Sequence, residues 1–156
     1  MKFVISVIFI ALFASFAVAQ EYEYGKPDDL KGLTTVYIDT HGNIKDREKI
    51  IEEIKKAKLD LTAVDAKSDA TIFINFSTTT SRQAVGRTIV NPVDPQYNAH
   101  VVSEYDLEAG DGMVTVKGKS PTVPRVVLNF HGGRRNPAGD FVKKFIKAYK
   151  EANGLK

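Results

Sequence analysis

Ser68-Asp-Ala-Thr-Ile-Phe-Ile-Asn-Phe-Ser77 is the stretch on which the fold depends, because it is typical of a central β-strand. Ile72, Ile74 and Phe76 alternate with Thr71, Phe73 and Asn75, which predicts one apolar face and one mixed face. A similar pattern recurs in Val126-Val-Leu-Asn-Phe-His131, with Val126, Leu128 and Phe130 expected on the apolar face. Two such strands in one sheet would present a continuous apolar face to covering helices.

Two amphipathic helices are predicted to provide that cover. The first runs from about Ile44 or Asp46 to Lys58, and its apolar stripe consists of Ile50, Ile51, Ile54 and Ala57. The second runs from Pro137 to about Ala152, after a favourable N-cap at Asn136. Its stripe contains the larger side chains Phe141, Val142, Phe145, Ile146 and Tyr149.

The other predicted strands are short. They cover residues 33–39, 59–64, 99–107 and 113–117, and Gly110-Asp-Gly112 is predicted to form a hairpin turn between the last two. Residues 78–98 are predicted to be a long irregular loop, since Pro92 and Pro95 exclude a central strand there. We therefore predict an α/β (α+β) two-layer sandwich, with a mixed sheet of about six strands and two helices on one face.

The N-terminus indicates export. Lys2, the apolar run from Phe3 to Phe16 and the small residues Ala17-Val-Ala19 match a cleaved signal peptide. The domain plan is then a signal peptide at 1–19, a flexible leader at 20–31 and a single domain at 32–156. Residues 21–24 fit either a short edge strand or a disordered tail. We expect a periplasmic or secreted chain with no stable membrane span after cleavage.

Composition narrows the functional classes. The chain has 156 residues, no cysteine and a net charge of +3, so its fold depends on the core without disulfides. So mild a charge does not indicate nucleic-acid binding, which requires a concentrated basic face. No Gly-x-Ser-x-Gly turn, cysteine nucleophile or His-x3-His spacing is present, so neither a catalytic centre nor a metal or cofactor site is predicted.

Two candidate sites remain. His41 and His131 each follow a predicted strand, and parallel strands would bring both to one sheet edge, near Asp39, Arg134 and Arg135. Such a cluster could hold an anionic group or support a hydrolase, although a glycine-rich turn with solvated arginines explains the same residues. The second candidate is the open sheet face, which we expect to carry the residues Tyr37, Phe73, Asn75, Val127, Asn129 and Tyr105. The alternative is that the 78–98 loop folds over this face and covers it.

Five segments carry a resemblance to known proteins: Leu33-Thr-Thr-Val-Tyr-Ile-Asp39, Asp46-Arg-Glu-Lys-Ile-Ile51, Ser68-Asp-Ala-Thr-Ile-Phe-Ile74, Pro124-Arg-Val-Val-Leu128 and Phe141-Val-Lys-Lys-Phe-Ile-Lys-Ala-Tyr-Lys-Glu-Ala-Asn153. Over most of the chain after the signal, they resemble a group of exported bacterial domains of unknown function. The layout is similar to that of small envelope lipoprotein domains that assemble with other envelope proteins. Many of those are lipidated, and this chain lacks the cysteine that would carry a lipid.

Three functional hypotheses follow. The first is an exported, non-enzymatic binding or envelope-associated module that uses the open face to bind a protein partner or a second copy. The second is a small anionic-ligand-binding protein or hydrolase using His41, His131, Arg134 and Arg135. The third is a secreted inhibitor that acts through the 78–98 loop.

Overall fold

The computed structural model describes residues 22–89, 99–118, 123–133 and 135–155. The predicted signal peptide at 1–19 therefore lies outside the described residues. In chain order the elements are β1 (Glu23–Tyr24), the 3-10 helix η1 (Pro27–Leu30), β2 (Thr35–Asp39), α1 (Ile44–Lys56), β3 (Thr62–Val64), the 3-10 helix η2 (Lys67–Asp69), β4 (Ile72–Ile89), β5 (Ala99–Val116), β6 (Arg125–Gly132) and α2 (Pro137–Asn153).

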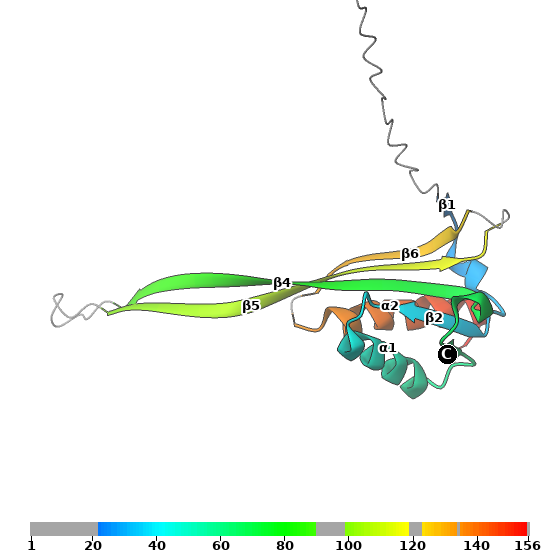
Figure 1. The fold of residues 1–156 in the computed structure, drawn as a ribbon, viewed down its shortest axis with the longest axis horizontal. Helices are drawn as coiled ribbons and strands as arrows, with labels where there is room; N and C mark the ends of the chain where they lie inside the picture. The colour runs from blue at the N-terminus through cyan, green and yellow to red at the C-terminus, as the bar shows by residue number, and fades with distance from the viewer. Residues whose placement is uncertain (1–21, 90–98, 119–122, 134, 156) are drawn as a thin grey trace, which may run out of the picture.

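The strands form one mixed sheet in the order β1-β6-β5-β4-β2-β3. β2 is parallel to both β3 and β4, while β5 is antiparallel to β4 and β6, and β1 is parallel to β6. Both helices cover the same face of this sheet (Figure 1). The predicted two-layer α/β architecture of a six-stranded mixed sheet with two helices is confirmed.

β4 is the central strand, as its alternation predicts. Ile72, Ile74 and Phe76 are buried against the helices, each at most 1% exposed, whereas Asn75 is exposed on the opposite face. The strand lies between β2 and β5, so it is paired on both sides over its first residues. An apolar residue at every second position therefore builds the centre of the core.

The helices begin, end and pack as their sequences predict. The Oδ1 atom of Asn43 caps α1 by accepting a hydrogen bond from the backbone N–H of Asp46, and Asn136 caps α2 in the same way through Gly139. α2 ends at Gly154, whose φ of 65° is left-handed. The large buried side chains of the helices are Ile50 and Ile54 of α1 and Phe141, Val142, Phe145 and Tyr149 of α2.

The prediction of a loop at 78–98 is wrong for residues 78–89. β4 continues to Ile89, and its ladder with β5 runs without interruption from Ile72–Val116 to Ile89–Ala99. The distal parts of the two strands form a ribbon that projects beyond the helices (Figure 1). Residues 90–98, the remainder of the predicted loop, lie outside the described residues.

The prediction of a turn at 110–112 is also wrong, because Gly110 and Gly112 lie inside the continuous strand β5. A Cβ atom at Gly112 would lie 2.5 Å from Cδ2 of Phe141, and one at Gly110 would lie 2.7 Å from Cζ of Phe76. These glycines therefore provide room for the aromatic side chains, and no reversal of the chain occurs there.

A β-bulge changes the second copy of the core pattern. Val114 pairs with Leu128 but Thr115 pairs with Val126, which leaves Val127 as an extra residue in β6. Val127, which we expected on the open face, is 7% exposed and belongs to the core.

Part of the predicted flexible leader is ordered. Glu23 and Tyr24 pair with β6 as strand β1, and Leu30 is fully buried. Arg125 of β6 holds this segment through ion pairs with Glu23 at 3.1 Å and Asp29 at 3.0 Å. Residues 22–31 are therefore joined to the domain.

Candidate functional site

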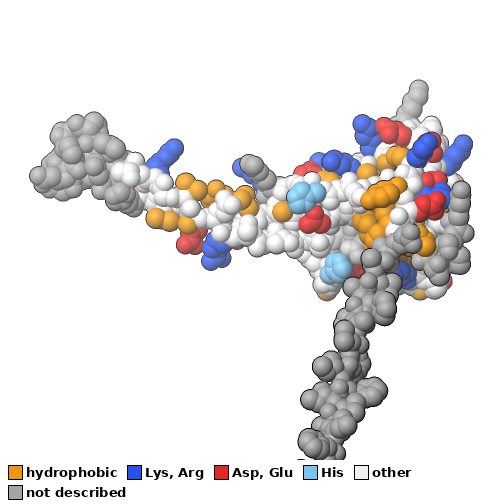
Figure 2. All heavy atoms as spheres, turned by 90° about the horizontal axis from the view of Figure 1, so that it is seen from above, with side chains coloured by type: hydrophobic (Ala, Val, Ile, Leu, Met, Phe, Trp, Pro, Cys, Tyr) orange, Lys and Arg blue, Asp and Glu red, His pale blue; other side chains and the backbone are white. Residues whose placement is uncertain are grey.

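No helix or strand of the described residues covers the sheet face opposite the helices, which we call the open face, and Figure 2 looks onto it. Strand register places Asp39, Asn75, Met113 and Asn129 side by side across four strands. In the adjacent row Tyr37 pairs with Phe73, and Phe73 pairs with Thr115. The four residues predicted for a partner surface, Tyr37, Phe73, Asn75 and Asn129, thus occupy neighbouring positions on this face.

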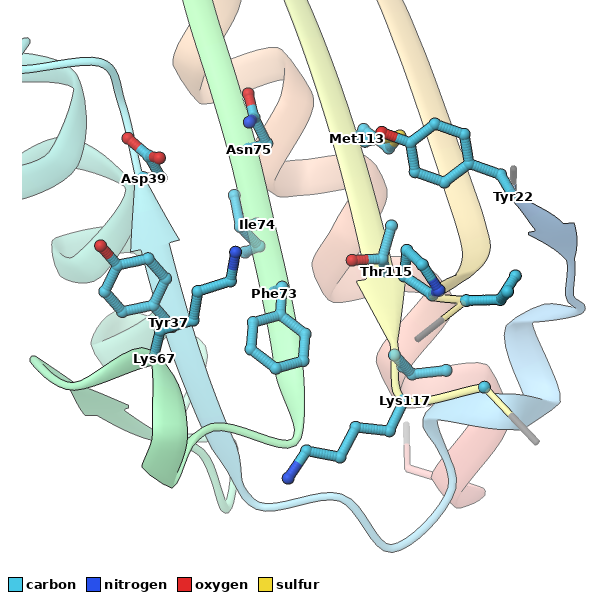
Figure 3. A pocket seen from close by; sticks show the side chains of 14 residues that line it. Tyr22, Tyr37, Asp39, Lys67, Phe73, Ile74, Asn75, Met113, Thr115 and Lys117 are labelled. Atoms are coloured by element: carbon cyan, nitrogen blue, oxygen red, sulfur yellow. The ribbon is translucent and has the colours of Figure 1, made fainter. Parts of the chain in front are cut away.

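A pocket of about 660 Å³ occupies the end of the open face nearest η2 and β1 (Figure 3). We call it the open-face pocket. It draws residues from β2, β4 and β5, from η2, from the connection between β5 and β6 and from the residue preceding β1. Its lining comprises Tyr22, Tyr37, Asp39, Lys67, Phe73, Ile74, Asn75, Met113, Thr115, Val116, Lys117, Gly118, Val123 and Pro124.

Aromatic side chains form one part of the pocket. Tyr37 and Phe73 lie on adjacent parallel strands and are directly paired in register, and Tyr22 lies toward Met113 from the N-terminal side (Figure 3). Aromatic side chains at neighbouring positions of a sheet present apolar surfaces that can pack against a planar or apolar group.

Two lysines supply positive charge. Nζ of Lys67 lies 5.9 Å from the centroid of the Phe73 ring, close enough for a cation–π contact. Lys67 and Lys117 are both exposed, and within the described residues neither forms an ion pair with an acidic side chain. Asp39 also lines the pocket, but its Oδ1 accepts a hydrogen bond from the backbone N–H of His41 at 2.9 Å. The two ammonium groups are therefore available to an anionic ligand.

A second hollow adjoins this pocket at Asn75 and Met113 and includes Ser77, Asp111, Asn129 and His131. Nδ1 of His131 lies 2.5 Å from Oδ1 of Asp111, its partner across the ladder. Nε2 of His41 lies 2.9 Å from Oδ1 of Asn75. Both histidines are thus held by neighbouring polar side chains on the open face.

Three of the four residues of the predicted histidine and arginine cluster, His41, His131 and Arg135, lie among the described residues, and they lie on different parts of the fold. β2 and β6 run in the same direction, so His41 and His131 do reach the same end of the sheet, but β4 and β5 lie between their strands. Arg135 lines a small hollow on the helix side, together with Asp46 of α1 and Ala138 of α2. Arg134 lies outside the described residues.

The turn after β6 determines where Arg135 lies. Gly132 and Gly133 have φ values of 141° and 92°, and they lead the chain from the sheet into the helix layer. The strand pattern indicates where β6 ends, but it does not indicate to which face the next side chains turn.

Several residues of the open-face pocket were not anticipated. Thr115 and Met113 alternate with the buried Val114 and Val116, so the period-two pattern alone could have placed them on the open face. Lys67 begins the 3-10 helix η2 and Lys117 follows the last residue of β5, and neither position has a periodicity that would predict it.

The described residues contain no group of three or more histidine, aspartate or glutamate side chains arranged to hold a metal ion. None of the helices in the described ranges combines the length and apolar character needed to cross a membrane. Comparison of the chain with models of known protein families, with curated proteins and with solved structures yields no match.

Proposed function

We propose that this protein is an exported, non-enzymatic binding module and that its ligand occupies the open-face pocket. The observation that carries the proposal is that Tyr37 and Phe73, neighbours in strand register, line one pocket with Lys67, whose ammonium group lies over the Phe73 ring, and with Lys117. Export rests on the signal-like residues 1–19, and an envelope location rests on the resemblance to small envelope domains.

The chemistry of the pocket favours one class of ligand. A planar or apolar ring would pack on Tyr37 and Phe73, and a carboxylate or phosphate on that ring would meet Lys67 or Lys117. Asn75 offers an amide for orientation, as the few polar groups of ligand pockets generally do. We therefore expect an aromatic or cyclic acid, such as an acidic sugar or an aromatic carboxylate.

A binding role fits this lining better than catalysis. Among the described residues, those that line the pocket include no serine, cysteine or histidine, while Thr115 is only 6% exposed. A nucleophile activated by an adjacent base is the usual basis of covalent catalysis, and this lining does not supply one.

A thermal-shift panel on the exported chain tests the proposal, with aromatic carboxylates, acidic sugars, cell-wall fragments and inorganic phosphate as probes. A ligand at about 100 times its dissociation constant should stabilise the fold by about 2.7 kcal/mol, which is several degrees for a domain of this size. We expect a large shift in melting temperature only from ligands that carry both a ring and an acidic group, and little shift from inorganic phosphate alone.

Substitutions identify the site. Lys67→Gln with Lys117→Gln should remove most of the shift, whereas Lys143→Gln, an exposed lysine on α2, should leave it unchanged. A flat panel, or a shift that survives the double substitution, would overturn the assignment of the pocket. Cell fractionation with mass measurement of the N-terminus tests export, and an intact N-terminus in the cytosol would refute it.

A further inference from the structure

The ribbon that projects from the domain has two uncovered edges. We define the arm as residues 79–89 of β4 and 99–109 of β5, which pair with each other along their whole length. The last β4 residue paired with β2 is Asn75, and β6 pairs with β5 only from Gly110 onward. Within the described residues, both outer edges of the arm lack a neighbouring strand.

The arm has few of the features that normally protect an exposed edge. Its strands contain no proline and no lysine, and β4 carries Thr79, Thr80, Val85 and Thr88. Isolated two-stranded ribbons are marginally stable in water, and long exposed edges accept a further strand unless proline, lysine or a bulge prevents it. Exposed apolar side chains occur on both strands, at Val85 (48% exposed), Val101 (42%), Val102 (63%) and Tyr105 (43%).

The shape of the domain restricts how a second copy could pair with the arm. At the base of the arm, β2 and β3 continue the sheet beyond β4, and β6 and β1 continue it beyond β5. If two paired arms pointed the same way, the flanking strands of one copy would overlap those of the other, because paired strands lie only about 4.8 Å apart. The arms must therefore point in opposite directions, which makes like strands antiparallel.

Charge distinguishes the two edges. The arm strand of β5 carries Glu104, Asp106 and Glu108 without a lysine or arginine, so pairing β5 with its own copy would bring carboxylates together. The arm strand of β4 carries Arg82 and Arg87, and Nε of Arg82 is already paired with Oδ1 of Asp106 at 3.3 Å. The β4 edge is thus the favourable one for a second copy.

We propose that two copies of this chain associate by antiparallel pairing of their β4 arm strands about a two-fold axis at Ala84. In this register Arg82 faces Gly86 of the second copy, and Arg87 faces Ser81, so that arginine never opposes arginine. A Cβ atom at Gly86 would meet no atom within 4 Å, which leaves room for the Arg82 side chain. Closed two-fold pairing of this kind is the commonest symmetry among oligomers.

Single cysteines test the register, since the natural chain contains none. Directly opposed residues of antiparallel strands have Cα atoms about 4.5–5.5 Å apart, within the range of a disulfide. Under mild oxidation, Ala84→Cys should form a covalent dimer, whereas Val102→Cys on the other strand of the arm should not. Equal cross-linking of the two variants would overturn the proposal.

Charge at Ser81 provides an independent test by light scattering over a concentration series. Ser81→Lys would oppose Arg87 of the second copy and should weaken the dimer about tenfold, while Ser81→Glu should keep or strengthen it. Circular dichroism of both variants reports whether the fold is retained. A natural chain that stays monomeric up to its solubility limit, or two variants that behave alike, would refute the proposal without affecting the ligand site.

Discussion

Phe76 of β4 stacks on Phe141 of α2, with ring centroids 5.1 Å apart and ring planes inclined by 23°. Phe130 of β6 meets the same Phe141 ring edge-on, at 5.7 Å. This aromatic cluster joins the sheet to the second helix where the arm begins, and Gly110 and Gly112 leave the room that it occupies.

Gly112→Ala should destabilise the protein by about 1–3 kcal/mol, because the added methyl group overlaps the Phe141 ring. Gly86→Ala is the matched control at concentrations where the chain is monomeric, since it lies in the same hairpin with open space around it, and we expect it to be neutral or stabilising by about 0.5 kcal/mol. Chemical denaturation measures both changes. Similar effects of the two variants would contradict the packing role of Gly112.

Phe145→Ala should cost about 3–5 kcal/mol, because this side chain is fully buried in the core and its loss leaves a cavity. Lys147→Ala, at an exposed position of the same helix, should change the free energy of unfolding by less than about 0.5 kcal/mol. Urea midpoints provide the comparison. An unchanged midpoint for Phe145→Ala would mean that α2 does not seal the core as described.

Tyr149→Phe should lower stability by about 1–2 kcal/mol at neutral pH. The single hydroxyl proton is shared between the backbone oxygens of Leu33 at 2.8 Å and Asp60 at 3.3 Å, and the substitution leaves both acceptors without this donor. Burial, together with the charge of Asp60, raises the pKa of Tyr149 above its ordinary value of 10.0.

The raised pKa of Tyr149 also predicts how its contribution varies with pH. Since the folded protein favours the neutral phenol, the contribution is complete below pH 10 and decreases as the pH rises through the folded-state pKa. The difference in unfolding free energy between natural protein and Tyr149→Phe should therefore shrink in alkali. A difference that stays constant there would contradict this prediction.

Asp29→Asn should destabilise the protein by about 1–2 kcal/mol at neutral pH, because Asp29 binds the backbone N–H of Lys26 and the guanidinium group of Arg125. These contacts, the Lys26 hydrogen bond foremost, hold the pKa of Asp29 below its ordinary value of 3.8. The contribution is thus present above pH 3.8 and is lost as the pH falls below it toward the folded-state pKa.

Acid titration of unfolding checks this prediction, with Asp28→Asn, at the exposed neighbouring position, as the control for net charge. The gap between the natural protein and Asp29→Asn should narrow below pH 3.8, while the Asp28 variant should follow the natural protein throughout. Parallel curves for the two variants would show that β1 and η1 are not held by Asp29.

The sequence predicted the elements whose signals are local. Alternation along residues 72–76 and the apolar stripes of α1 and α2 depend on the neighbours within each segment, and the caps at Asn43 and Asn136 depend on one side chain each. The placement of Tyr37, Phe73 and Asn75 on one face follows from the same alternation once β2 and β4 are adjacent.

Only part of the arm could be predicted in this way, because residues 99–107 were predicted as a strand and residues 79–89 as a loop. Its strands face solvent on both sides, so they carry no apolar period, and hydroxyl-rich sequence resembles a loop. Gly110 and Gly112 have the sequence of a turn, but glycine is needed at these positions because a larger side chain would overlap Phe76 or Phe141. Both aromatic residues are distant in the sequence. The positive φ values at Gly132 and Gly133 likewise decide where Arg135 lies, and composition alone does not reveal that direction.

The inhibitor hypothesis stays a prediction, but the described part of the segment that it names is a β-strand and not a loop. Residues 78–89 belong to a strand of the arm, paired throughout with β5. An inhibitory role would therefore have to use the arm rather than a loop, and deletion of the arm followed by an inhibition assay would test it.

We expect the β4–β5 hairpin to form early in folding, starting at its tip, because the pairs of its ladder are nested. Ile89 and Ala99, at the tip of the ladder, are close in sequence, and each pair toward the base, as far as Ile72 and Val116, encloses the pairs already formed. Zippering from the tip closes only short loops at each step, whereas β1 can join β6 only after the intervening chain is in place. A refolding experiment with pulsed hydrogen exchange should therefore protect the amides of the hairpin before those of Glu23 and Tyr24.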